Sequence, residues 1–172
     1  MNAPSDLTPD VASHLRCDVA IVGGGPAGLM AAEVLAQAGV AVHLFDAMPS
    51  VGRKLLLAGK GGLNLTHSEP HEPFASRYAG HQPQIEPLIR AFGGPEVRAW
   101  AQGLGVETFV GTSGRVFPAD MKAAPLLRAW LQRLRAQGVQ FHMRHRWLGW
   151  ADGGALRFAA CAGEVQVTAK AV

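Results

Sequence analysis

The alternation of apolar and polar positions near the start of the chain predicts a strand, a helix and a second strand. Val19–Val22 is a continuous apolar run, which is typical of a parallel strand buried on both faces. Pro26–Gln37 has apolar side chains at helical spacing, and Val40–Phe45 is apolar again. The positions expected to face a sheet are Leu29, Ala32, Leu35 and Ala36. Together these segments predict a β-α-β unit with parallel strands.

Beyond this unit, the hydrophobic pattern predicts short helices and strands. A helix capped by Ser50 is expected near Val51, and the proline-rich residues 70–84 are expected to form an exposed connection. The further expected helices are Ile85–Phe92, Glu96–Gly103 and Ala123–Gln137. The further expected strands are a hairpin of Val106–Val110 with Arg115–Phe117, a third parallel strand at Val139–Phe141, and an antiparallel meander from Trp147 to Thr168. Residues 1–16 are expected to be a flexible lead-in and residues 17–172 to form one domain.

Composition and charge exclude several classes of protein. Apolar residues make up 48% and charged residues 17% of the chain, which is ordinary for a globular protein. The net charge of +3 fits an anionic cofactor and only weakly supports nucleic-acid binding, so no nucleic-acid partner is expected. Cys17 and Cys161 form no zinc or dithiol motif, and reduced thiols favour the cytoplasm. Neither a signal-peptide pattern nor an apolar stretch of membrane-spanning length is found, so no membrane partner is expected.

The turn between the first strand and the first helix carries the spacing G-x-G-x-x-G at Gly23, Gly25 and Gly28. Gly23 allows a tight turn, Gly25 lets a pyrophosphate approach the backbone, and Gly28 lets the helix pack close to the sheet. Asp46 follows the second strand, 18 residues after Gly28, where a carboxylate accepts hydrogen bonds from an adenosine ribose. The turn therefore predicts a dinucleotide site that also includes Gly24, Pro26 and Ala27.

A second glycine-rich stretch, residues 52–66, allows two interpretations. Its backbone amides, together with Arg53, Lys54 and Lys60, could line a phosphate or an electron-rich ring. The same composition equally fits a mobile surface loop with solvated lysines. The nearby His67, His71 and His81 have no ligand spacing on a single helix face, so surface histidines are expected there rather than a metal site.

Three sequence blocks resemble the BaiN-like NAD(P)/FAD-dependent flavoproteins, also known as the aminoacetone oxidase family. They are the fingerprint from Ile21 to Gly28, the loop from Gly52 to Thr66, and Gly114–Pro118 followed by Lys122-Ala123. The chain departs from the family's usual loop, because Gly62-Leu63 replaces an Arg-Cys pair and His67 replaces an Asn.

This resemblance implies a glutathione-reductase-type, Rossmann-like FAD-binding α/β domain with a parallel sheet and a small antiparallel β-meander. It implies that Arg53, Lys54, Asn64, Leu65 and Thr66 lie along the ribityl-phosphate and flavin. It also places Trp147 where a strand contacts the adenine through its backbone.

The resemblance predicts an FAD-dependent oxidoreductase that transfers hydride between FAD and NAD(P)H or a small organic substrate. Because Ala169–Val172 looks like the start of a strand, the chain is expected to be truncated, to lack its substrate domain and to be inactive alone. Two alternatives stay open: an NAD(P)-binding module without flavin, and a non-catalytic fragment. No catalytic residue is assigned.

Overall fold

The computed structural model describes residues 13–172, and these divide into two compact units. The first unit contains the described residues up to Val51 together with Leu134–Val172, and the second contains Gly52–Arg133. The boundary near residue 134 falls inside helix α6 (Ala123–Ala136). The hydrophobic pattern, which predicts one domain over residues 17–172, shows no sign of this division.

The first unit is built on a six-stranded sheet with the order β6-β2-β1-β9-β8-β7. Its strands are β1 (Ser13–Val22), β2 (Val42–Asp46), β6 (Gln140–Met143), β7 (Arg146–Trp150), β8 (Leu156–Ala160) and β9 (Gly163–Ala171). Strands β6, β2, β1 and β9 run parallel, whereas β8 is antiparallel to both β9 and β7. The α/β class, the third parallel strand and the antiparallel meander are therefore confirmed.

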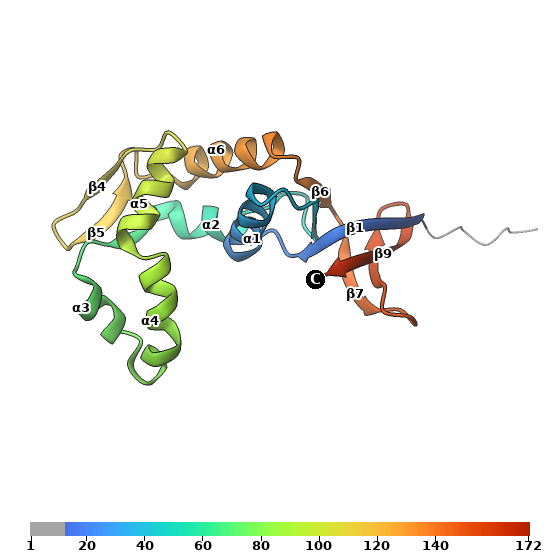
Figure 1. Cartoon of the computed structure of the whole chain (residues 1–172). Helices are drawn as coiled ribbons and strands as arrows, with labels where there is room; N and C mark the ends of the chain where they lie inside the picture. Colours follow the sequence, from blue (N-terminus) through green and yellow to red (C-terminus); the bar gives the residue numbers. More distant parts are fainter. Residues whose placement is uncertain (1–12) are drawn as a thin grey trace, which may run out of the picture. The chain divides into compact units, whose positions relative to one another are not determined.

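Strand β9 joins the meander to the parallel strands, so the meander is not a separate sheet. Ser13 to Cys17 pair in parallel with Val165 to Ala169, and the two strands lie side by side in Figure 1. The expectation of a flexible lead-in is therefore wrong for residues 13–16, whose backbone groups bond to β9; the rest of that prediction lies outside the described residues. Residues 169–171, expected to begin a strand, complete β9 instead.

Helix α1 (Pro26–Gln37) has the predicted bounds. It begins with Pro26 because the first helical position needs no N–H donor and the proline ring already holds a helical φ. Of the four residues expected to face the sheet, Leu29 and Ala32 are buried and Leu35 and Ala36 are half-buried, while Glu33, which the pattern does not place on that face, is buried as well. The helix connects β1 to β2, and the β-α-β unit is confirmed.

The core of the first unit lies inside a strongly curved sheet. The rings of Phe45 on β2 and Phe158 on β8 stack with centroids 4.4 Å apart, although β1 and β9 lie between their strands in the sheet. The sheet must therefore bend until β8 faces β2. Ala20, Leu156 and Val167 are fully or almost fully buried in the same cluster, and burial of such side chains is the main source of stability.

The second unit combines short helices with a three-stranded antiparallel sheet of order β3-β5-β4. Its elements are α2 (Arg53–Ala58), η1 (Gly59–Gly61), β3 (Thr66–His67), α3 (His71–Ser76), η2 (Ala79–His81), α4 (Gln82–Ala91), α5 (Gly94–Gly103), β4 (Thr108–Val110), β5 (Arg115–Pro118) and the start of α6. Leu63, Ala101, Ala123 and Leu126 form its core. Beside them the rings of Trp100 and Trp130 meet edge to face, 4.8 Å apart.

Two expectations for the second unit are wrong. Most of residues 70–84 are exposed as expected, but they are helical: they contain α3, η2 and the start of α4, because Pro73 and Pro83 lie in first helical turns that tolerate proline. Ser50 does not cap α2. The N-cap residue of this helix is Gly52, whose backbone is in the left-handed conformation, and no side chain caps the helix. The hairpin of β4 with β5 is confirmed. Across the described residues, no helix has the length and apolar character needed to cross a membrane.

Candidate functional site

The glycine-rich turn after β1 is fixed to the end of β2 by two backbone donors. The Gly23 N–H donates to the Phe45 carbonyl at 2.8 Å, and the Gly24 N–H donates to Asp46 Oδ2 at 2.6 Å. The hydrogen bond to a carboxylate is of the stronger, charge-assisted kind. Folding thus brings the fingerprint and the acidic residue together, as their spacing in the sequence predicts.

The N-terminus of α1 has the features of an anion cradle. Gly25 is its extended N-cap, the helix has no side-chain cap, and no acidic residue lies in its first turn. The first helical hydrogen bond is donated by Leu29 to the Gly25 carbonyl, so the preceding amides of Ala27 and Gly28 are left for a ligand. A Cβ added at Gly25 would meet nothing within 4 Å. A pyrophosphate therefore fits this space and this polarity.

Two other glycines in the turn are required by close packing. A Cβ on Gly28 would collide with the Gly23 carbonyl oxygen, and a Cβ on Gly24 would collide with the Val51 side chain. Gly28 therefore permits the close approach that the sequence predicts for it. The contact of Gly24 with Val51 had no signal in the sequence.

Asp46 accepts hydrogen bonds through both carboxylate oxygens. Oδ1 accepts from the Met48 N–H at 2.7 Å, in addition to the bond from Gly24 to Oδ2. The bond two residues onward is the pattern of an Asx-turn, which the sequence Asp-Ala-Met leaves undecided. Each oxygen keeps lone-pair capacity for a further donor. Binding of a ribose by Asp46 stays a prediction, and the carboxylate is already held in a fixed orientation.

The turn between β6 and β7 supports the loop that carries Asp46. The His145 N–H donates to the Asp46 carbonyl at 2.9 Å, and the Arg144 N–H donates to the Met48 carbonyl at 3.1 Å. Arg144 has a φ of 60°, a conformation uncommon for a residue other than glycine. Sequence reasoning missed this support, because nothing local links residues 144 and 145 to Asp46.

The remaining predicted site residue in the first unit lies on β7. Trp147 pairs with Phe158 of β8, and its side chain is 45% exposed. Its ring meets that of Trp150 edge to face, with centroids 6.2 Å apart. The contact of its backbone with an adenine stays a prediction.

The second unit contains the other predicted flavin-contacting residues. Arg53 and Lys54 are exposed in the first turn of α2. Asn64 is exposed, the Leu65 N–H donates to the Val116 carbonyl at 2.9 Å, and Thr66 pairs with Val116 in the small sheet. The glycine-rich loop is thus anchored by regular structure, with its 3₁₀ turn η1 in place of an irregular segment. Its role toward a flavin stays a prediction.

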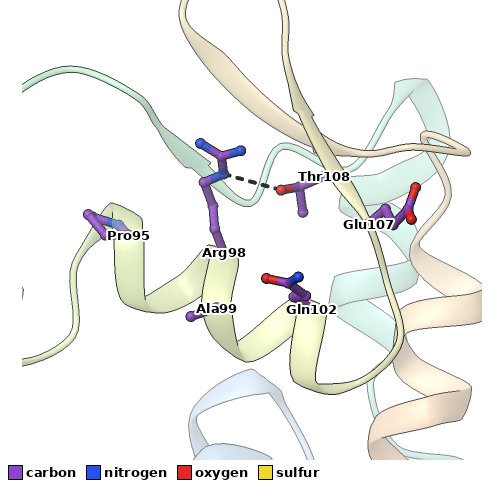
Figure 2. A pocket seen from close by; sticks show the side chains of 6 residues that line it. All are labelled: Pro95, Arg98, Ala99, Gln102, Glu107 and Thr108. Atoms are coloured by element: carbon purple, nitrogen blue, oxygen red, sulfur yellow. Dashed lines mark hydrogen bonds between the residues drawn. The ribbon is translucent and has the colours of Figure 1, made fainter.

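A surface hollow of about 520 Å³ lies between α5 and β4 in the second unit, as Figure 2 shows. In it, Arg98 Nε donates to Thr108 Oγ1 at 3.2 Å, while Gln102 and Glu107 are exposed. An open hollow lined by exposed side chains shows no built binding site. Among residues 13–172, no group of three or more His, Cys, Asp or Glu side chains could hold a metal ion.

Comparisons with known proteins agree with the fold. The family model described as the HI0933-like protein Rossmann domain matches residues 17–172. A thiamine thiazole synthase of Pyrococcus horikoshii is 42% identical over 52 residues, which are 30% of this chain and 21% of that protein. A ribosomal RNA dihydrouridine synthase of Haemophilus influenzae is 45% identical over 49 residues, which are 28% of this chain and 12% of that protein.

A 3-ketosteroid dehydrogenase structure from Rhodococcus jostii has a similar fold. Its TM-score is 0.68 at 16% identity, covering 96% of this chain and 47% of that one. The chain therefore spans less than half of that solved structure, and the matched segments span about a fifth or less of these two curated relatives.

Proposed function

The chain belongs to the HI0933-like Rossmann-domain family, and on this premise we propose that it forms the FAD-binding part of a flavin-dependent oxidoreductase. One observation carries the proposal most directly. The N-terminus of α1 is uncapped and open at Gly25, while Asp46 is fixed beside it through Gly24. This arrangement suits the pyrophosphate and ribose of a dinucleotide.

Each residue set has a distinct part in holding the cofactor. The amides of Ala27 and Gly28 hold the pyrophosphate, and Asp46 accepts from the adenosine ribose hydroxyls. Trp147 contacts the adenine through its backbone. In the second unit, Arg53, Lys54, Asn64, Leu65 and Thr66 hold the ribityl-phosphate and approach the flavin ring. When bound, FAD supplies hydride transfer, and the protein supplies position and electrostatics.

The reaction partner is proposed to be a small organic molecule or NAD(P)H. No cysteine lies between Asp46 and Cys161, so a dithiol relay next to the second strand is absent from the sequence and hydride passes directly to or from FAD. No acid or base is assigned to catalysis. We therefore expect the 172 residues alone to bind FAD without turning over a substrate. A cytoplasmic location stays a prediction.

The visible absorption spectrum of the purified protein tests the proposal. The expected result is flavin absorption bands at close to one FAD per chain, either as purified or after FAD is added and excess is removed. Lack of retained flavin under both conditions, in a chain that circular dichroism shows to be folded, would overturn it.

The alternative of a nicotinamide module without flavin is separated from FAD binding by thermal shift. A ligand that binds only the native state stabilises it by RT ln(1 + [L]/Kd). FAD is expected to raise the Tm more than NADH or NADPH at equal concentration. A larger shift with either nicotinamide would favour that alternative.

A second candidate substrate is structured RNA. It departs from the expectation of no nucleic-acid partner, which rests on the net charge of the whole chain, because the charge is unevenly distributed. Residues 52–133 contain ten Lys and Arg against six Asp and Glu, whereas the rest of the chain contains six against seven. The excess positive charge of the second unit resembles an electrostatic footprint for phosphates. The similar Haemophilus influenzae protein is named as a ribosomal RNA dihydrouridine synthase, and this name is the reason for proposing RNA as the source of the phosphates.

Binding of a ribosomal RNA fragment in a gel-shift titration tests this second candidate. The expected affinity falls steeply as salt rises, because each phosphate contact releases counterions. Charge reversal at two exposed lysines, Lys60→Glu with Lys122→Glu, should weaken binding, whereas Arg16→Glu in the first unit should not. Equal weakening by both changes would indicate binding without a defined RNA surface.

A further inference from the structure

Three histidine rings form a cluster beneath the loop that carries Asp46. His43 on β2 and His142 on β6 are joined by a hydrogen bond between Nδ1 and Nε2 at 3.0 Å, and their rings stack with centroids 5.1 Å apart. The His145 ring lies edge to face with that of His142 at 5.6 Å. Two phenylalanines complete the stack, since His142 lies on Phe45 at 4.5 Å and Phe45 on Phe158.

Backbone bonds connect this ring cluster to the predicted ribose carboxylate. His145 donates its backbone N–H to the Asp46 carbonyl, and its ring Nδ1 bonds the Met143 carbonyl at 2.9 Å. Hydrogen bonds therefore fix both the backbone and the ring of His145. Strand β6 pairs with β2 in register, with Phe45 opposite His142 and Asp46 opposite Met143. Displacement of the His142 ring would therefore move the turn on which the Asp46 loop rests.

Among residues 13–172, no ion pair joins these three rings to an acidic side chain that would balance a positive charge. The titratable groups that face His142 are His43 from β2 and His145 from the turn, while β8 contributes the neutral ring of Phe158. Burial, followed by the two neighbouring histidines, lowers the pKa of His142 to about 4. Burial likewise lowers the pKa of His43. At neutral pH the His43 and His142 rings are therefore uncharged and stacked.

We propose that this histidine cluster is an acid-sensitive support that positions Asp46, so that acidification releases the adenosine end of the cofactor site. The proposal rests on the proposed function, because it concerns regulation of that site. A proton gained by the His142 or His43 ring brings an unbalanced charge into a half-buried stack, and protonation of both adds repulsion between the two rings. The charged ring moves toward water, the turn at Arg144 and His145 shifts, and Asp46 loses its fixed position.

Nuclear magnetic resonance of the wild-type chain tests the support without any cofactor. The imidazole signals of His142 are expected to titrate near pH 4, and the amide signals of Gly24, Met48 and His145 should shift with the same midpoint. Amide signals at the Asp46 loop that stay unchanged while His142 titrates would overturn the proposal. Signals of Gly80 in the second unit serve as the internal reference.

Fluorescence titration with FAD at two pH values tests the regulation. The dissociation constant of the wild-type chain is expected to be about twofold higher at pH 4 than at pH 7.5, because about half of the His142 rings are then protonated and the non-binding state is populated to that extent. His142→Phe keeps a ring on Phe45 without a titratable group, so its ratio should be closer to one. His81→Phe, at an exposed histidine of the second unit, should keep the wild-type ratio.

The outcomes separate the two proposals. Absence of FAD binding at pH 7.5 contradicts the proposed function, and the cofactor-free resonance titration then decides whether the support exists. Binding at pH 7.5 with the same ratio in the wild type and in His142→Phe overturns the support alone. Any titration of the adenine itself is common to all three proteins and cancels in their comparison.

Discussion

Gly25 and Gly28 belong to the same turn but have opposite surroundings, and this difference separates binding from folding. A methyl group at Gly28 would be forced against the backbone carbonyl of Gly23, which cannot rotate away as a side chain could. A methyl group at Gly25 would enter open space in front of the helix N-terminus. Gly28 therefore serves packing, and Gly25 leaves the space that the predicted pyrophosphate contact requires.

Gly28→Ala is expected to destabilise the first unit by about 1–3 kcal/mol, since overpacking against backbone forces the turn to shift. Gly25→Ala is expected to cost less than about 1 kcal/mol of stability, because alanine is only a poorer N-cap, yet to weaken FAD binding. Urea unfolding and FAD titration of both variants check this. Equal stability losses would contradict the assignment of separate roles.

Asp46→Ala removes the acceptors for the amides of Gly24 and Met48 as well as the predicted ribose contact. FAD binding should weaken by about 1–3 kcal/mol, the range for hydrogen bonds to charged groups. Calorimetric titration measures it. Asp46→Asn serves as the control, because it keeps an oxygen acceptor but loses the charge. Unchanged affinity in both variants would remove Asp46 from the list of ribose ligands.

At the scale of elements, a bulge in β7 sets the direction of its tryptophans. Trp147 lies opposite Phe158 and Trp150 lies opposite Leu156, with a register shift between residues 147 and 149. Both partners on β8 are buried on the same face, so the extra residue places two tryptophans three positions apart on one face. Gly149 accommodates the bulge with a φ of 115°.

Gly149→Ala should destabilise the first unit by about 1–3 kcal/mol, because a non-glycine residue is strained at this φ although space is open around it. The change should also alter the edge-to-face Trp pair, which near-ultraviolet circular dichroism detects. Gly80→Ala, with open space and no positive φ, is the matched control and should leave both measurements unchanged. A Gly149→Ala protein of wild-type stability and spectrum would argue against the bulge.

At the scale of the whole molecule, the groups whose pKa values are lowered make stability fall as the solution becomes acidic. The pKa values of His142 and His43 are lowered by burial, and those of Asp18 and Glu164 are lowered by hydrogen bonds from Lys170 and Arg157. In each case the contribution to stability is present above the unfolded-state pKa. It is lost as pH falls through the folded-state pKa.

The free energy of unfolding should therefore decrease as pH falls from about 7 to about 4, with the His142 contribution lost between its unfolded value near 6.5 and about 4. Urea unfolding at half-unit intervals of pH measures the slope. His142→Phe should reduce the slope in this window and leave the steeper loss below pH 4, where carboxylates titrate. A wild-type slope in that variant would show that His142 does not titrate in this range.

The sequence by itself determined what depends on neighbouring residues and on local pattern. The bounds of α1, the β-α-β unit and the packing role of Gly28 follow from residues within about 30 positions of one another. The family resemblance rests on three short blocks, each of which is a local pattern. The prediction that prolines break regular structure at residues 70–84 is wrong, however, because the effect of a proline depends on its position within a helix turn.

Only the tertiary structure decided how distant segments meet. The parallel pairing of β9 with β1, the stack of His43 on His142, and the support of Asp46 by His145 join residues about a hundred or more positions apart. Such pairs leave no periodic trace in the sequence, since each partner is chosen by sheet register and burial rather than by its neighbours. The fingerprint was therefore readable as a dinucleotide turn, while the histidine support beneath it was not.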